Sequence, residues 1–334
     1  MSIVIITDSD VHVYMIPKVI AHRGACSVAP ENTMSAFRAA FDLGTDGFET
    51  DVQITKDSVP VIQHNYSIEE NSDGEGKVSE MTLDELRGFD FGSWFDERFA
   101  GERIATLEEC LGYGKRFRLV NIEIKAPVSE KRDSVLPVAE MIASSGYPER
   151  IIVSSFDHSI LKEIKETYPE LRVGALVYSK MIAYGAMLDR CLPGDKKLCS
   201  VTLADASIPD DTLRTGSMDM SADDMRRWAV NMVNSIGMTY PWMTVRELAE
   251  EARRQSDLCT YAKEIGFELD YMHCDYPMCL KDPSMVDRLH GIGVGVNIWT
   301  PNDEDLLRRL AAMGPDGIIT NRPDTLLKIL REND

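Results

Sequence analysis

The chain has 334 residues, enough for one large core, and α/β barrels commonly reach this length without dividing into domains. Its formal net charge of -19 at pH 7 repels phosphate backbones and anionic lipid surfaces, which argues against nucleic-acid binding. The 7 cysteines are odd in number and lack the close paired spacing of a zinc site, so we interpret them as reduced thiols.

The N-terminal region carries no targeting pattern. Its apolar stretch from Ile3 to Ile6 is too short for a signal peptide and has no basic residue before it, and no apolar run approaches the length of a membrane helix. We therefore expect a cytoplasmic protein without stable membrane insertion. The same stretch is expected to form a short hairpin that closes one end of a barrel.

The first strand and helix pattern follows this stretch. Residues 19–21 predict a strand that leads into His22-Arg23-Gly24, and an amphipathic helix is expected after Pro30. Asn32 is the expected N-cap of this helix, and Gly44 is expected to end it. A strand, a helix and a further strand in succession are typical of a parallel sheet.

Two pairs of ionisable residues lie inside apolar, strand-like runs. Glu49 and Asp51 are separated by one residue, as are Glu123 and Lys125, so each pair projects from one face of its strand. Isolated buried charges would be costly there. Three carboxylates on converging strands suit Mg²⁺ or Ca²⁺ better than zinc, and salt bridges on a sheet face are the alternative interpretation.

The strand that carries Glu49 and Asp51 is expected to fold back on itself. It continues to Thr55, turns at residues 56–58 and resumes over residues 59–64. Because a parallel crossover needs a dozen or more residues, the returning strand must be antiparallel. This return brings His64 toward the end of the strand that carries the carboxylates.

Further strand patterns alternate with helical patterns along the rest of the chain. Together with the first two strands they make eight, which predicts a (β/α)8 TIM barrel with its chemistry at the C-terminal strand ends. His22, the two acid-containing pairs and Trp299 all fall at or near such ends. The further strands are expected at 119–125, 150–156, 171–177, 268–274, 293–300 and 317–320, with helices including 159–168 and 303–313.

Two stretches interrupt this alternation, although residues 1–334 are expected to form a single barrel domain. Residues 66–106 follow His64 and are expected to be a capping insertion over the site. Residues 178–267 are far longer than a normal connection and contain helical patterns at 222–236 and 244–255, so we expect a helical insertion. Its Met and Trp side chains are expected to form its core, with a mobile lid or a subunit contact as the alternative.

An ordered set of short motifs accompanies these strand ends. They are His22-Arg23-Gly24, Pro30-Glu31-Asn32-Thr33, Glu49-x-Asp51, Val61-Ile62-Gln63-His64, Ile122-Glu123-Ile124-Lys125, Ser154-Ser155-Phe156 and Asn297-Ile298-Trp299-Thr300. In order and spacing, the set closely resembles the glycerophosphodiester phosphodiesterase family, whose barrel is of the phospholipase-C-like phosphodiesterase type. The resemblance covers residues 19–178 and 270–323 and leaves the middle insertion outside it.

The resemblance implies a barrel that hydrolyses glycerophosphodiesters to sn-glycerol 3-phosphate and an alcohol with one divalent cation, Mg²⁺ or Ca²⁺. The chemistry agrees, because a phosphodiester needs its charge neutralised, a nucleophile activated and a leaving alkoxide protonated. The implied site consists of the metal ligands Glu49, Asp51 and Glu123, the acid–base pair His22 and His64, and the substrate- or phosphate-binding residues Arg23, Lys125 and Trp299.

Two positions depart from the family pattern. Asn65 stands where the family commonly has Asp after the histidine, and an amide can keep that hydrogen bond but not the charge. Glu70 stands where the family tends to have a basic residue, which bears on the leaving-group preference but not on the metal or the acid–base pair. The remaining histidines, interpreted as surface or packing residues, are His12, His158, His273 and His290.

Three functional hypotheses follow. The first is hydrolysis of soluble deacylated phospholipids, with a small-molecule substrate as the only expected partner and a homo-oligomer left open. The second is cleavage of lysophospholipids or another phosphodiester on the same barrel, which the apolar insertion favours. The third is a barrel that binds a phosphorylated ligand without turnover, motivated by Asn65, Glu70 and the long insertion.

Overall fold

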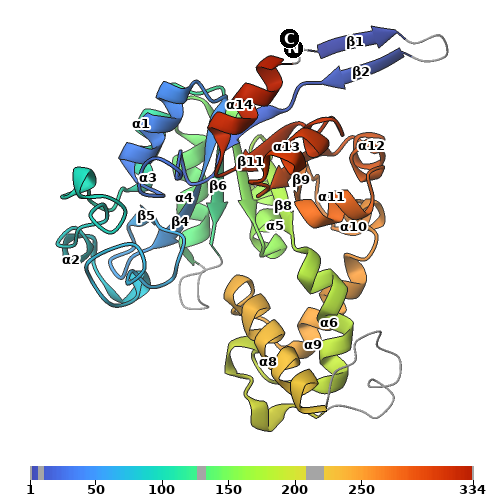
Figure 1. The fold of residues 1–334 in the computed structure, drawn as a ribbon. Coiled ribbons are helices and arrows are strands. Elements are labelled where there is room, and N and C mark those ends of the chain that lie inside the picture. Colours follow the sequence, from blue (N-terminus) through green and yellow to red (C-terminus); the bar gives the residue numbers. More distant parts are fainter. Residues whose placement is uncertain (1, 7–10, 126–132, 208–221, 333–334) are drawn as a thin grey trace. The chain divides into compact units, whose positions relative to one another are not determined.

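The structure is a computed structural model that describes residues 2–6, 11–125, 133–207 and 222–332. Contacts divide the chain into two compact units, one made of Met1–Leu176 with Gly266–Asp334 and the other of Val177–Ile265. The first unit contains the large sheet, and the second is helical in the part that the structure describes (Figure 1).

The sheet of the first unit closes into the predicted (β/α)8 barrel. Its strand order is β3-β11-β10-β9-β8-β7-β6-β4-β5, and the additional pairing of β3 with β4 closes the ring. Strand β5 lies outside the ring and pairs antiparallel with β4, as predicted. The strands are β3 (Lys18–Ala21), β4 (Gly47–Ile54), β5 (Pro60–Ile62), β6 (Leu119–Ile124), β7 (Ile151–Ser155), β8 (Arg172–Val177), β9 (Tyr271–Asp275), β10 (Gly295–Trp299) and β11 (Gly317–Thr320).

Helices alternate with these strands and surround the barrel (Figure 1). Inside it, Ile20, Leu119, Ile152 and Ile319 form a buried apolar cluster. The polar strand-end residues are therefore supported from within by a packed core. The helices of this unit are α1 (Met34–Leu43), α2 (Leu83–Leu86), α3 (Leu107–Gly114), α4 (Val135–Ala143), α5 (His158–Thr167), α11 (Tyr276–Lys281), α12 (Met285–His290), α13 (Glu304–Ala311) and α14 (Pro323–Glu332).

Helix α1 shows one prediction confirmed and one wrong. Gly44 ends the helix in the left-handed conformation, with a φ of 81°, as predicted. The N-cap, however, is Thr33, whose hydroxyl accepts a hydrogen bond from the backbone N–H of Ala36. Asn32 is not the N-cap, because its side chain is directed to Asp51 and Thr50 instead.

The segment 66–106 has a small core of its own. Val61 of β5 packs with Ile68, Val78, Leu86 and other buried side chains of this segment. Its regular structure is limited to α2 and two short 3-10 turns, Val78–Glu80 and Glu97–Phe99. This cluster attaches the segment to the returning strand that precedes His64.

The second unit contains the predicted helical patterns. Its helices are α6 (Ser179–Cys191), α8 (Ala222–Thr239), α9 (Val245–Arg254) and α10 (Leu258–Glu264). Aliphatic side chains such as Leu188 and Leu248 form its core. The expectation of a Met and Trp core was wrong for Met238, which is 77% exposed. The other described residues concerned are half-buried: Trp228, Met232, Trp242 and Met243. Met218 and Met220 lie outside the described residues.

The N-terminal hairpin is present as β1 (Ser2–Ile6) and β2 (Val11–Met15), which pair antiparallel. Its expected role in closing the barrel stays a prediction. Within the described ranges, no helix combines the length and the apolar character needed to cross a membrane.

Candidate active site

Three carboxylates meet at the C-terminal end of neighbouring strands. Glu49 and Asp51 project from β4, and Glu123 projects from β6 in register with Asp51. Glu49, Asp51 and Glu123 are only 3%, 1% and 8% exposed, and one oxygen from each lies within 4.8 Å of the others. Hard oxygen donors this close together fit a Mg²⁺ or Ca²⁺ ion.

Burial and mutual repulsion disfavour the ionised form of two of these three carboxylates. Burial, followed by the charges of Asp51 and Glu123, raises the pKa of Glu49 well above its ordinary value. Burial also raises the pKa of Glu123, partly offset by Lys125. Burial opposes ionisation of Asp51, but His64, Lys125 and Arg23 together hold its pKa below the ordinary value. A divalent cation would favour the ionised form of all three groups.

Two cations flank the cluster. Lys125 Nζ lies 2.8 Å from Glu123 Oε1 and 3.6 Å from Asp51 Oδ1, and Arg23 Nε lies 3.6 Å from Asp51 Oδ2. Although burial disfavours its charge, Glu123 and Asp51 raise the pKa of Lys125 above the ordinary value. Arg23 also pairs with Glu31 at 2.8 Å, and its backbone N–H donates to Glu49 Oε2 at 2.9 Å. Both cations stay charged beside the carboxylates.

His22 follows β3 and reaches the cluster with one ring nitrogen. Its Nε2 lies 3.8 Å from Glu49 Oε2, and its Nδ1 lies 2.6 Å from Asn321 Oδ1. Because a carbonyl oxygen only accepts, Nδ1 carries the proton and Nε2 has the free lone pair. Burial, then the charge of Arg23, lowers the pKa of His22 to about 3, so the ring is neutral at pH 7.

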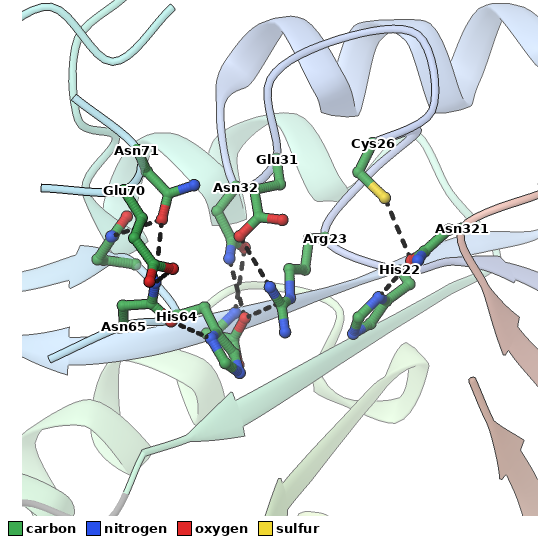
Figure 2. A network of polar contacts seen from close by, with 12 residues as sticks. His22, Arg23, Cys26, Glu31, Asn32, His64, Asn65, Glu70, Asn71 and Asn321 are labelled. Carbon is green, nitrogen blue, oxygen red and sulfur yellow. Dashed lines mark hydrogen bonds and ion pairs between the residues drawn. The ribbon is translucent and has the colours of Figure 1, made fainter. Parts of the chain in front are cut away.

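His64 follows β5 and is held in the same way. Its Nδ1 lies 2.7 Å from Asn65 Oδ1 (Figure 2). Gln53 Nε2 donates to the backbone carbonyls of residues 63, 64 and 65, which holds the end of the returning strand against β4. Burial, then the charge of Lys125, lowers the pKa of His64 to about 3. The backbone N–H of Gln63 donates to the Asp51 carbonyl at 3.0 Å, which brings the following residue, His64, beside the strand that carries the carboxylates.

Sequence reasoning missed two amides that hold the site. Asn32 Nδ2 donates to Asp51 Oδ2 at 2.9 Å, while its Oδ1 accepts from the Thr50 hydroxyl at 2.8 Å. Asn321 accepts from His22 at the end of β11. The position of Asn321 directly after the last strand is a signal that could have found it, because the C-terminal strand ends share one face of the barrel. The signal for Asn32 was misleading, since Asn is also a common N-cap.

The remaining predicted site residue is Trp299. Trp299 ends β10, donates its indole N–H to the His273 carbonyl at 2.9 Å and packs edge-on against Phe156. His273 is fully buried in the barrel, and the half-buried His158 and His290 bond to Leu176 O and Asp316 Oδ2, as expected of surface or packing residues. The side chain of His12 lies outside the described residues.

The arrangement can hold a cation and an anion side by side. The carboxylates are suited to a divalent cation, Arg23 and Lys125 are suited to an oxyanion, and two neutral imidazoles have a free Nε2 for a proton. This combination is typical of a site that cleaves a phosphate ester.

Comparison with known proteins points to one family. The sequence model of the glycerophosphoryl diester phosphodiesterase family matches residues 22–192 and 195–325. These ranges include the middle insertion. The part of the chain that the short motifs assigned to the family, which left this insertion out, was therefore too short.

Two sequence relatives match different lengths of this chain. A glycerophosphodiester phosphodiesterase of Caldanaerobacter subterraneus subsp. tengcongensis is 43% identical over 159 residues, which is 47% of this chain and 65% of that protein. The match thus covers less than two thirds of that relative. YhdW of Bacillus subtilis is 26% identical over 311 residues, covering 93% of this chain and 96% of that protein.

Solved structures share the fold. A phosphodiesterase of Oleispira antarctica, solved with the product sn-glycerol-3-phosphate, has a TM-score of 0.64 and 22% identity, covering 95% of this chain and 97% of its own. A glycerophosphodiester phosphodiesterase of Agrobacterium tumefaciens has a TM-score of 0.60 and 20% identity, covering 94% and 98%.

Proposed function

Because this chain belongs to the glycerophosphoryl diester phosphodiesterase family, we propose that it hydrolyses glycerophosphodiesters to sn-glycerol 3-phosphate and an alcohol, with a divalent cation. The observation that supports this proposal is the buried cluster of Glu49, Asp51 and Glu123. Two cations flank the cluster, and His22 Nε2 lies 3.8 Å from Glu49 Oε2. The sn-glycerol-3-phosphate bound to the Oleispira antarctica phosphodiesterase supports the same product class for this chain.

The proposed cation ligands are Glu49, Asp51 and Glu123. Their fit is supported by the raised pKa values of Glu49 and Glu123, which reflect burial of like charges without enough neighbouring positive charge. The donors are all oxygens, which favours Mg²⁺ or Ca²⁺ over softer metals. When bound, such an ion would neutralise phosphate charge and lower the pKa of an attacking hydroxyl.

Arg23 and Lys125 are the proposed phosphate clamps. Each contacts Asp51 at 3.6 Å, so a phosphate that approaches the cluster meets positive charge on two sides. Lys125 is held by Glu123 and is therefore oriented before a substrate binds. Trp299 is the proposed apolar contact to the substrate, because it is the last residue of β10 and its indole N–H is donated to the backbone.

His22 and His64 are the proposed proton-transfer pair. Both are neutral at pH 7 because burial and neighbouring cations lower their pKa values to about 3, and both have Nε2 free to accept a proton. A phosphodiester anion between the clamps would offset the charges of Arg23 and Lys125 and raise both pKa values toward neutrality. One histidine can then take a proton from the nucleophile while the other supplies one to the leaving alkoxide.

Residues 66–106 are the proposed cap of this site, and 178–267 the proposed helical insertion. The cap assignment is supported by the contact of Glu70 with Asn65, next to His64. The insertion assignment is supported by the separate compact unit Val177–Ile265. The segment 66–106 is a candidate for contacting the alcohol portion of the substrate.

The test is release of sn-glycerol 3-phosphate from a panel of glycerophosphodiesters, including glycerophosphocholine and glycerophosphoethanolamine. Protein stripped with EDTA is reconstituted separately with Mg²⁺, Ca²⁺ and Mn²⁺. We expect cation-dependent release and a ranking of the alcohols. Lysophosphatidylcholine, included in the panel, tests the alternative substrate class. Absence of release with every cation and substrate would contradict the proposal.

A further inference from the structure

A chain of hydrogen-bonded side chains leads from His64 through Asn65 to the exposed Glu70 (Figure 2). Asn65 Oδ1 lies 2.7 Å from His64 Nδ1, and Asn65 Nδ2 donates to Glu70 Oε2 at 2.8 Å. Asn65 Nδ2 also lies 3.4 Å from Asn71 Oδ1, and the backbone carbonyl of Asn65 accepts from Gln53 at 2.6 Å. Asn65 therefore connects the ring of a proposed proton-transfer residue to an exposed carboxylate.

The orientation of the Asn65 amide decides which nitrogen of His64 carries the proton. A carboxylate only accepts hydrogen bonds, and Asn71 presents its amide oxygen, so both groups require the NH₂ side of Asn65. If the amide turned over, its oxygen would face two acceptors and its NH₂ would face His64. The observed orientation leaves Oδ1 for the ring, so Nδ1 must donate and Nε2 keeps its lone pair.

We propose that Glu70 is a positioning residue that acts through Asn65 to hold His64 in the Nδ1–H tautomer. The catalytic consequence rests on the proposed function, because only a hydrolytic reaction would use the free Nε2 of His64. The tautomer itself is a property of the protein and can be measured without turnover. Glu70 lies outside the carboxylate cluster and is exposed, so a substitution there alters this hydrogen-bond chain without removing a buried group.

Residues 65 and 70 form a matched donor and acceptor pair. Asn65→Asp replaces the donor with a carboxylate oxygen that faces Glu70, and the two negative charges repel each other. Glu70→Lys replaces the acceptor with a donor that faces the NH₂ group of Asn65, which favours the turned amide. The double variant Asn65→Asp/Glu70→Lys pairs an ammonium with a carboxylate whose second oxygen can accept from His64 Nδ1.

The first measurement is the tautomer of His64 in ¹⁵N-histidine-labelled protein, from multiple-bond ¹H–¹⁵N correlation spectra at pH 7. A His64→Gln variant assigns the signals. We expect the Nδ1–H pattern in the unmodified protein and in Glu70→Gln, which retains an acceptor oxygen, and a shift toward the Nε2–H form in Glu70→Lys. Glu75→Lys is the matched control, because it makes the same change of charge at an exposed residue of the same segment. An unchanged tautomer in Glu70→Lys would overturn the proposal.

The second measurement is steady-state hydrolysis by the same variants. Glu70→Lys should lower kcat about tenfold with little change in KM, as for other residues that orient a functional histidine. Asn65→Asp keeps an acceptor oxygen for His64 Nδ1, so its kcat should change less than that of Glu70→Lys. The double variant should recover most of the loss of Glu70→Lys, whereas a double variant as slow as Glu70→Lys would overturn the pairing. Circular dichroism checks folding, and Glu70→Ala provides a second variant without an introduced charge, expected to give a mixture of tautomers. If the unmodified protein hydrolyses no glycerophosphodiester, the proposed function fails while the tautomer still decides this inference.

Discussion

The sequence and the structure lead to different predictions for the effect of replacing Asn32. As an N-cap, its loss would cost about 1 kcal/mol of unfolding free energy and leave cation binding unchanged. In the structure, Asn32→Ala removes a donor to the buried Asp51 carboxylate at 2.9 Å and an acceptor for the buried Thr50 hydroxyl at 2.8 Å. A hydrogen bond to a charged group contributes about 1.5–3 kcal/mol, and an unpaired buried hydroxyl costs about 1–3 kcal/mol. We therefore expect a loss of about 3 kcal/mol.

The same variant should weaken cation binding, because Asn32 orients one of the proposed ligands. Residues in this position typically change metal affinity by about 10–100-fold. The assays are chemical denaturation of the cation-free protein and calorimetric titration with Mg²⁺ or Ca²⁺. Thr33→Ala is the matched control, since it removes the actual N-cap, costs about 1 kcal/mol and leaves the affinity unchanged. If Asn32→Ala behaved like Thr33→Ala in both assays, the reasoning would be refuted.

Three further predictions concern the carboxylates and the histidines. Glu123→Gln should abolish cation-dependent turnover with an unchanged circular dichroism spectrum, and equal activity of the unmodified protein in EDTA would argue against the metal assignment. His22→Ala and His64→Ala should each lower kcat by about 10²–10⁴-fold, and a rate near that of the unmodified protein would exclude that histidine from proton transfer. Burial lowers the pKa of His273 from 6.5 to about 3, so below pH 6.5 the unfolded chain binds a proton that the folded chain does not. The free energy of unfolding should therefore fall as the pH drops, by up to about 1.4 kcal/mol per pH unit from this group. Denaturation of His273→Gln should show a smaller fall in this free energy between about pH 6.5 and pH 4.5 than the unmodified protein shows. An equal fall would contradict the assignment.

The sequence by itself determined the barrel and the location of its site. Strand and helix periods are local properties, and alternation of eight such units leaves few ways to close a parallel sheet. Because parallel strands end on one face, charged residues at strand ends such as Glu49 and Glu123 had to gather there. The antiparallel return before His64 also followed from the chain itself, since the connection is too short for a crossover.

Only the tertiary structure decided which neutral residues hold those charged ones. Asn32 could cap a helix or bind a carboxylate, and its choice of Asp51 depends on how the loop after β3 folds against β4. Asn321 is 299 positions from His22 in sequence, so their contact exists only once β11 closes the ring beside β3. Likewise, Glu70 meets Asn65 through the packing of the segment 66–106. Local patterns specify the charges of this site, but a polar side chain acquires its partner only when distant segments pack together, because a hydrogen bond requires contact within about 3 Å.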